Sequence, residues 1–208
     1  MRLKGIVSGV FSLGLVAAGV VLIAVFAFNL FQGPTGGSGD GSSGGGFNVP
    51  ELSDNQSAEA GGPEDKTLDI TIPAMSRIED DEVPNAAGDD LQALKENAAI
   101  HLRGTGYPWQ EQSNTYLAGH RLGYPTTDSF LSFYDLQKLE NGDEIFVEDS
   151  EGTEYTYRVF KDFVVGPQDL SVTEPVDGKS VLTLQTCTLP DYSERLIVQA
   201  ELVETEPA

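Results

Sequence analysis

Short stretches of apolar and β-branched residues, alternating with polar ones over 67–73, dominate the chain from residue 67 onward and predict a mainly β fold. The strand patterns lie at 67–73, 114–119, 144–149, 154–160 with a continuation at 163–165, 181–186 and 195–203. They are bounded by glycine, proline and other turn residues, as strands in small β domains are. The segment Ser150–Thr153 between two of them is typical of a β-hairpin turn. Seven or eight short strands with few helices favour a closed barrel.

Helical patterns are confined to two segments of the same region. Residues 89–99 begin with two acidic residues, which is the composition expected at a helix start. Residues 133–139 predict a short helical turn. The domain is therefore expected to carry one or two short helices on a β framework.

An uncharged apolar run near the start of the chain, Gly5–Phe28, predicts a single transmembrane helix. As a helix it would be about 36 Å long, enough for a hydrocarbon core of about 30 Å. Arg2 and Lys4 precede it and the next basic residue is Lys66, so we expect a cytoplasmic N-terminus and an extracellular remainder. The alternative is a cleaved signal peptide, but its apolar region usually spans only about 7–15 residues, which favours an uncleaved anchor at the cell membrane.

Composition divides the chain into three parts. Glycine fills 8 of the 14 positions in 33–46, as in a flexible coil. We expect a cytoplasmic N-terminus and anchor at 1–32, an extracellular tether at 33–65 and one folded domain at 66–208.

Acidic residues far outnumber basic ones. The chain has 33 acidic and 12 basic residues, and all the acidic ones follow the apolar run with 10 of the basic ones, so that part carries −23. Such a charge repels nucleic acid and other polyanions. The acidic run Glu79–Glu82 lacks the ordered spacing of an EF-hand loop, which favours a solvated face over a calcium site. Phosphate-binding loops, dinucleotide fingerprints and zinc-ligand spacings are absent from the sequence.

Candidate chemistry is concentrated at the ends of three predicted strands. Cys187, the only cysteine, ends one strand and Arg195 begins the next, so an antiparallel pair would bring thiol and guanidinium together. His120 ends an apolar strand beside Gly119, where its side chain can face a cleft. His101 follows the predicted helix and is interpreted as structural.

These residue types suit acyl transfer. A thiolate attacks a carbonyl carbon and an imidazolium protonates the leaving amine. A guanidinium stays charged and donates to an oxygen that becomes negative. We therefore consider His120, Cys187 and Arg195 as a catalytic group, although their spacing alone does not establish that they converge.

The sequence resembles the sortases, membrane-anchored transpeptidases of Gram-positive bacteria, over about residues 67–203. The resemblance is carried by Thr183-Leu-Gln-Thr-Cys187 with Arg195 on the following strand, by Leu117-Ala-Gly-His-Arg121, and by the pattern F-x-x-L-x-x-L-x-x-G-D-x-I at 133–145. It implies a closed eight-stranded β-barrel in which His120, Cys187 and Arg195 are catalytic. It also implies that the cysteine cleaves the Thr–Gly bond of a C-terminal sorting signal, forms a thioester and passes it to an amine. The implied partners are surface proteins that bear this signal and an acceptor such as a lipid-linked peptidoglycan precursor, and no cofactor is implied except calcium in some members.

Several features depart from the commonest family pattern. The Cys187–Arg195 loop is short and no Asp-Pro-Trp lid precedes His120. We also expect the protein to lack the C-terminal hydrophobic anchor that is frequent in pilus-building members. The context resembles the actinobacterial class E or a related class, and the sorting motif is either Leu-Pro-x-Thr-Gly or Leu-Ala-x-Thr-Gly. The alternatives are a silent sortase-like barrel that binds at the cell surface, a pilus-assembling sortase, and, more weakly, a cysteine L,D-transpeptidase.

Two further positions allow a site role and a plain packing role. Thr186 would help to form the oxyanion site through its backbone or hydroxyl, but a threonine in a strand equally serves packing. Tyr107 and Trp109 flank Pro108 before the histidine strand, where loop packing is favoured over a role as a cleft wall.

Overall fold

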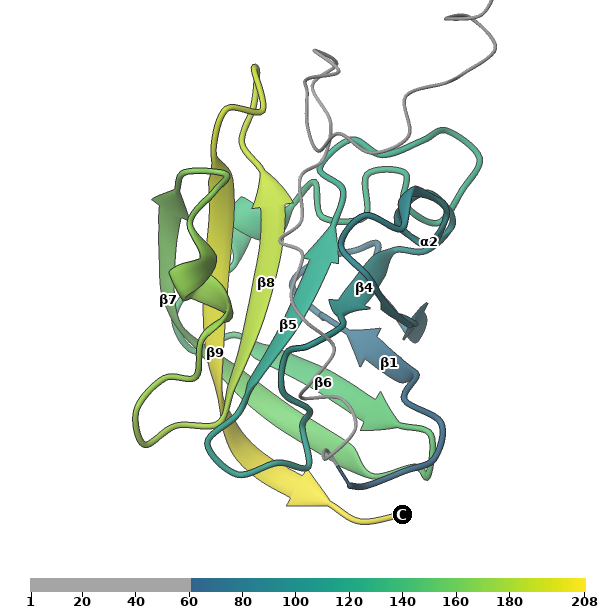
Figure 1. Cartoon of the computed structure of the whole chain (residues 1–208), viewed down its shortest axis with the longest axis vertical. Coiled ribbons are helices and arrows are strands. Elements are labelled where there is room, and N and C mark those ends of the chain that lie inside the picture. Colours follow the sequence, from purple (N-terminus) through teal and green to yellow (C-terminus); the bar gives the residue numbers. More distant parts are fainter. Residues whose placement is uncertain (1–60) are drawn as a thin grey trace, which may run out of the picture. The chain divides into compact units, whose positions relative to one another are not determined.

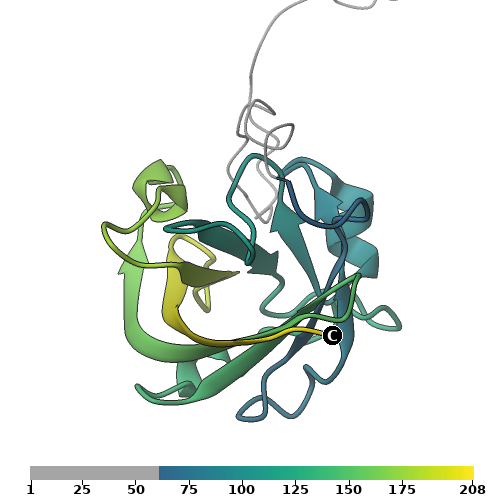
Figure 2. The same cartoon turned by 90° about the horizontal axis from the view of Figure 1, so that it is seen from below.

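A single curved sheet forms the framework of the part that the structure, a computed structural model, describes, residues 61–208. Its nine strands follow the order β2-β1-β6-β7-β9-β8-β5-β4-β3 and curl into a nearly closed barrel (Figures 1 and 2). The strands are β1 (Leu68–Thr71), β2 (Asp81–Val83), β3 (Asn85–Ala86), β4 (Ala99–Leu102), β5 (Asn114–Gly119), β6 (Glu144–Asp149), β7 (Glu154–Val165), β8 (Val181–Cys187) and β9 (Arg195–Glu206). The described helices are short: α2 (Leu91–Glu96), η2 (Leu136–Lys138) and η3 (Leu170–Thr173).

Side-chain alternation along the strands separates two apolar clusters. The larger cluster fills the barrel and takes in Leu182 and Leu184 from β8 and Val198 from β9. The smaller one includes Tyr116 of β5 and Ile197 of β9, with Ala86, Leu94, Ile100, Leu102, Ala118 and Val172. It lies on the outer face of β4, β5, β8 and β9, and residues of α2 and η3 complete it. This outer face is therefore partly covered rather than fully exposed.

The mainly β architecture and the hairpin expected from the sequence are confirmed. Antiparallel β6 and β7 enclose the predicted turn, in which Gly152 has φ +86°, a left-handed conformation that favours glycine. The sheet of residues 61–208 has nine strands where eight were expected. β2 and β3, the short strands at its two ends, contain three and two residues and have no counterpart among the strands predicted from the sequence.

The helix predicted at 89–99 extends beyond the observed helix α2, which covers Leu91–Glu96. Asp90 caps α2 by accepting from the backbone N–H groups of Gln92 and Ala93, and the helix ends at Glu96. Ala99–Leu102 instead forms β4, which pairs with both β3 and β5. Pairing with two neighbouring strands overrides the helical propensity of the alanines.

The expected transmembrane anchor at 5–28 lies outside the described residues, as does nearly all of the expected tether at 33–65. Within residues 61–208, none of the helices has the length and apolar character needed to cross a bilayer.

Candidate active site

Strand pairing brings the three predicted catalytic residues to one edge of the sheet. Strands β5 and β8 are parallel, and their last registered pair is Ala118 with Gln185. Two residues further along come His120, which directly follows β5, and Cys187, which is the last residue of β8. Both therefore lie at the carboxyl ends of neighbouring parallel strands, whose arrows point the same way in Figure 1. Strand β9 runs antiparallel to β8 and pairs Arg195 directly with Cys187. The convergence that spacing left open thus follows from the topology.

Cys187 and Thr186 point to opposite faces of β8. Leu182 and Leu184 belong to the barrel core, so alternation places Thr186 on the inner face and Cys187 on the outer one. The Thr186 hydroxyl is buried and has no hydrogen-bond partner among residues 61–208. A hydroxyl contact between Thr186 and a substrate at the sulfur is therefore not supported by this geometry, and a backbone role for Thr186 stays a prediction.

A close contact beneath the histidine fixes the end of β5. A Cβ atom at Gly119 would lie 2.8 Å from ring carbons of Phe133 and 2.9 Å from the carbonyl oxygen of Ala98, so only glycine fits. Past the strand, the backbone N–H of Phe133 donates to the carbonyl of His120 at 3.0 Å. The Ser132 hydroxyl donates to the same carbonyl at 3.2 Å. The first residue of the 133–145 pattern thus holds the backbone of His120 in place.

Burial works against the charged forms of both His120 and Cys187. It lowers the pKa of His120 to about 4. It also raises the pKa of the Cys187 thiol, and the positive charges of Arg195 and Arg121 oppose that rise. At neutral pH the free protein therefore holds mainly a neutral thiol and a neutral imidazole. A thiolate with an imidazolium is a minor population of the pair.

Arg195 is buried next to the cysteine and is held by its own loop. Its side chain is 3 % exposed, and Nη1 donates to the carbonyl oxygens of Tyr192 and Glu194, each at 3.0 Å. These contacts orient the planar guanidinium. The arrangement places a fixed cation beside the sulfur.

A second arginine lies next to the site, and no motif or spacing in the sequence predicts a role for it. Arg121 directly follows His120, and its charge acts on Cys187 together with that of Arg195. Its guanidinium carbon lies 5.8 Å from the centre of the Tyr134 ring. Its position beside the candidate histidine was the only sequence signal.

Asn114 fixes the η3 segment to the outer face. Its side-chain amide donates to the carbonyl oxygens of Val172 and Glu174, each at 2.9 Å. Its own oxygen accepts from the Thr183 hydroxyl at 2.7 Å. All of these groups lie along β5, β8 and η3, so the connection between β7 and β8 is tied to the strands that end at the candidate site.

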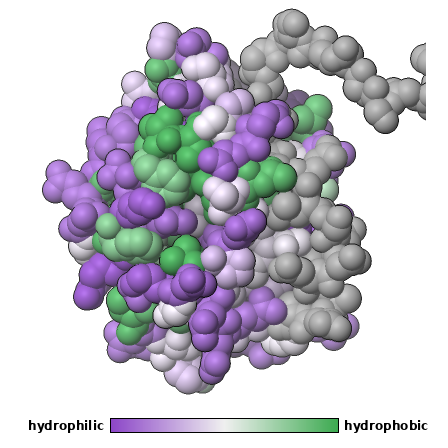
Figure 3. Space-filling model, turned by 60° about the vertical axis from the view of Figure 1, so that its left-hand side comes forward, coloured by the Kyte–Doolittle hydropathy of each residue, from purple (hydrophilic) through white to green (hydrophobic). Residues whose placement is uncertain are grey.

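Exposed apolar side chains lie next to the same edge. Val164, at the end of β7, Leu170 of η3 and Leu189 of the β8–β9 loop are 49 %, 46 % and 38 % exposed. Because β7 pairs its last residue, Val165, with Arg195, the end of β7 lies beside the candidate site. On this side of the molecule, apolar residues gather amid a largely hydrophilic surface (Figure 3).

His101 lies away from this edge, inside the protein. Asn85 Nδ2 lies 3.0 Å from its Nδ1, and its Nε2 lies 2.9 Å from the Gly106 carbonyl oxygen, which together fit a neutral ring with Nε2 protonated. Burial lowers the pKa of His101 to about 4. The buried, hydrogen-bonded ring supports the structural interpretation of this residue.

The aromatic residues before β5 pack on one another. Tyr107 and Trp109 stack with ring centres 4.7 Å apart, and Lys66 Nζ lies 5.0 Å from the centre of the Trp109 ring. They precede the amino end of β5, whereas Cys187 lies at the carboxyl end of the parallel strand β8. Their arrangement therefore supports loop packing and places them away from the candidate site.

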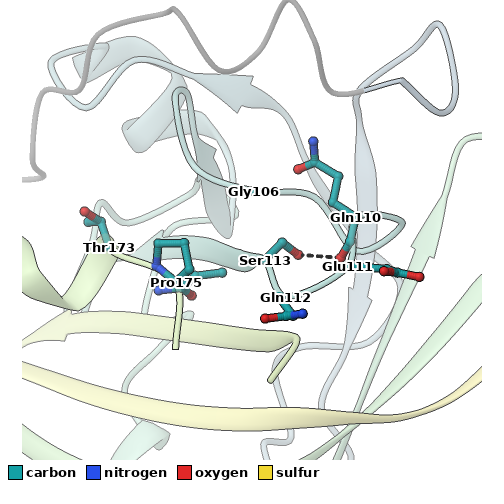
Figure 4. A pocket seen from close by; sticks show the side chains of 8 residues that line it. Gly106, Gln110, Glu111, Gln112, Ser113, Thr173 and Pro175 are labelled. Carbon is teal, nitrogen blue, oxygen red and sulfur yellow. Dashed lines mark hydrogen bonds between the residues drawn. The ribbon is translucent and has the colours of Figure 1, made fainter. Parts of the chain in front are cut away.

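A polar cavity of about 220 Å³ also lies near the amino end of β5 (Figure 4). It is lined by Gly106, Gln110, Glu111, Gln112, Ser113, Asn114, Thr173 and Pro175. None of the three predicted catalytic residues lines it, so it is separate from the candidate active site. In the described part of the chain, no group of three or more histidine, cysteine or acidic side chains is placed to hold a metal ion.

Comparisons with known proteins agree with this geometry. The family model of the sortase domain matches residues 70–203. Sortase A of Streptococcus agalactiae is 31% identical over 138 residues, which are 66% of this chain and 50% of that protein. Sortase A of Bacillus anthracis is 35% identical over 96 residues, 46% of this chain and 43% of that protein, so the matches span about half the length of these relatives. The solved pilus-related sortase C of group B Streptococcus is 27% identical with a TM-score of 0.56, covering 69% of this chain and 70% of that one.

Proposed function

The chain belongs to the sortase family, and from this premise we propose that it is a cysteine transpeptidase that cleaves the Thr–Gly bond of a C-terminal sorting signal. The observation that carries the proposal is the convergence of His120, Cys187 and Arg195 at the edge where β5 and β8 end and β9 begins. A nucleophile, a proton donor and a fixed cation at one place are the groups that acyl transfer requires.

In the first step, the Cys187 thiolate attacks the threonine carbonyl carbon of the bound signal. A carbon–sulfur bond forms, and the negative charge that develops on the carbonyl oxygen is stabilised by the Arg195 guanidinium. The tetrahedral intermediate collapses as the carbon–nitrogen bond breaks and the His120 imidazolium protonates the leaving glycine amine. The products are a thioester on Cys187 and a neutral His120.

The second step repeats this chemistry in reverse. An acceptor amine attacks the thioester carbon and gives a proton to neutral His120. The carbon–sulfur bond breaks, which releases the Cys187 thiolate and leaves a new amide bond. His120 is again an imidazolium, so the pair returns to its starting charge state.

The sorting signal is proposed to lie on the outer face of β8 beside η3. The sulfur faces this side, and the exposed apolar residues Leu170 and Leu189 offer contacts for the apolar residues of the signal. The hydrogen bonds from Asn114 hold η3 in place as the border of this surface.

The cellular setting is part of the same proposal. Residues 5–28 would anchor the protein in the cell membrane with the N-terminus in the cytoplasm, and residues 33–65 would tether the catalytic domain outside. The substrates would be surface proteins with a sorting signal, and the acceptor a lipid-linked peptidoglycan precursor. A pilus-assembling role, with a pilin lysine as acceptor, is the second candidate, because a pilus-related sortase C is among the similar structures.

The test is cleavage of quenched fluorescent peptides that contain Leu-Pro-x-Thr-Gly or Leu-Ala-x-Thr-Gly by the full-length protein. We expect cleavage of at least one peptide, transfer to an added amine and, by mass spectrometry, an acyl adduct on Cys187. Cys187→Ala should abolish all three while the thermal unfolding midpoint is retained. Cleavage that persists in Cys187→Ala would exclude this nucleophile, and binding without cleavage by the unaltered protein would favour the silent barrel.

A further inference from the structure

Arg121 carries a charge that the proposed mechanism does not use. It follows His120 directly, and its guanidinium lies over the ring of Tyr134, with the ring centre 5.8 Å from the guanidinium carbon. The Nε atom is buried and has no hydrogen-bond partner within residues 61–208. A buried donor without a partner lowers the free energy of unfolding, so the presence of Arg121 calls for an explanation other than stability.

Packing alone gives a weak reason for an arginine at this position. Tyr134 is 41 % exposed, so its contact with Arg121 is a surface contact. Asp135 also interacts electrostatically with Arg121, but one of its carboxylate oxygens lies 2.9 Å from Lys138 Nζ. The contacts of Arg121 with Tyr134 and Asp135 therefore do not explain why a cation lies beside Cys187.

We propose that Arg121 is a second cation of the active site, which stabilises the Cys187 thiolate from the β5 side while Arg195 does so from the β9 side. The geometry behind it is the parallel pairing of β5 and β8, which sets the end of β5 next to the end of the cysteine strand. The proposal deepens the proposed transpeptidase function and rests on Cys187 as its nucleophile.

The charged groups around the sulfur make two cations useful. Burial disfavours the thiolate, and Arg195 and Arg121 are the two charges that favour it. His120, the other titratable group at the end of β5, is neutral at neutral pH and adds no positive charge there. In the segment after β5, Tyr134 and Asp135 interact electrostatically with Arg121. Asp169, which precedes η3, interacts electrostatically with Tyr116 and does not affect the pKa of Cys187.

The experiment measures how fast iodoacetamide alkylates the full-length protein as a function of pH, without any substrate. Cys187 is the only cysteine, so the rate reports on one thiol. We expect Arg121→Gln to raise the apparent pKa of this thiol by about one unit and to lower the alkylation rate at pH 7 roughly tenfold. Arg121→Lys should retain most of the wild-type rate. Arg158→Gln, which removes an exposed arginine paired with Glu144, is the matched control and should leave the profile unchanged.

An unchanged alkylation profile in a folded Arg121→Gln variant would overturn the proposal. So would an Arg121→Lys variant as slow as Arg121→Gln, because a purely electrostatic role survives the exchange of one cation for another. If Arg121→Gln does not fold, Arg121→Met, which keeps the apolar stem, decides by the same criterion. Since no substrate is present, a protein that cleaves no sorting peptide would contradict the transpeptidase function and still return a result for Arg121.

Discussion

Cys187 and Arg195 form the last registered pair of the antiparallel ladder between β8 and β9. The side chain of Arg195 therefore starts from the strand directly beside the cysteine and does not depend on a long flexible loop. The carbonyl oxygens of Tyr192 and Glu194 hold it from the connection between the two strands. Fixed groups of this kind need little reorganisation when charge develops in a reaction.

Arg195 should act mainly in the transition state. We expect Arg195→Ala to lower kcat by about 10²–10³, or roughly 2.7–4 kcal/mol, with little change in KM, because a positioned donor at an oxyanion contributes about this much. Arg195→Lys should recover only part of the rate, since an ammonium keeps the charge but lacks the planar set of donors. Steady-state kinetics with a sorting peptide provide the measurement. A raised KM with an unaltered kcat would instead make Arg195 a binding residue.

The dependence of kcat/KM on pH should be a broad bell. Activity needs a thiolate and an imidazolium together, yet the pKa of His120 is lowered to about 4 and that of Cys187 is raised above its ordinary value. Below about pH 4 the remaining thiolate is lost, and above the cysteine pKa the remaining imidazolium is lost. Between these limits the small active population is constant, so the rate should form a plateau. A profile measured on His120→Ala with residual activity should lack the alkaline decline, and an unchanged profile would remove His120 from the mechanism.

Asn114 should control the η3 segment. Asn114→Ala removes both hydrogen bonds to this segment and leaves the Thr183 hydroxyl without its acceptor, so we expect a loss of about 2–3 kcal/mol in the free energy of unfolding. Limited proteolysis should become faster within 166–180, and KM for a sorting peptide should rise more than kcat falls. Asn97→Ala, which breaks a single bond within the α2 cap, is the control. Equal rates of proteolysis within 166–180 in the two variants would contradict the conclusion that Asn114 holds the η3 segment in place.

His101 should make the fold sensitive to acid. The unfolded chain binds a proton at this residue near its ordinary pKa of 6.5, whereas the folded protein does so only near 4. Stability from His101 is therefore complete above about pH 6.5 and is lost as the pH falls toward 4, by about 3 kcal/mol. Urea unfolding of the wild type and of His101→Gln at several pH values provides the test. The difference in unfolding free energy between the wild type and His101→Gln should shrink toward pH 4. A difference that stays constant with pH would contradict a lowered pKa of His101 in the folded protein.

Local sequence patterns predicted where the strands lie better than they predicted which strands pair with each other. The apolar and β-branched runs at 114–119 and 181–186 predicted β5 and β8, and each of these strands is buried on both faces, one in the barrel core and the other under the outer cluster. The parallel pairing of these two strands, which brings His120 to Cys187, joins segments far apart in the chain and leaves no local pattern. The adjacency of Arg195 was predictable because antiparallel strands with a short connection meet at one end.

The missed elements have physical explanations. β2 and β3 are too short to show alternation, and the start of β4 fits the end of a helix equally well because Ala98 and Ala99 suit either structure. Arg121 had no distinguishing spacing of its own. Its relation to the sulfur depends on how the chain leaves β5 after the histidine.

The close contacts at Gly119 make positions 119 and 133 unequal during evolution. A Cβ atom at position 119 would meet both the Phe133 ring and the backbone carbonyl of Ala98, so a smaller residue at position 133 would remove only one of the two clashes. Position 133 is less restricted, because any residue other than proline can supply the backbone N–H that holds the His120 carbonyl. Lineages of this protein can therefore vary position 133 while position 119 stays glycine.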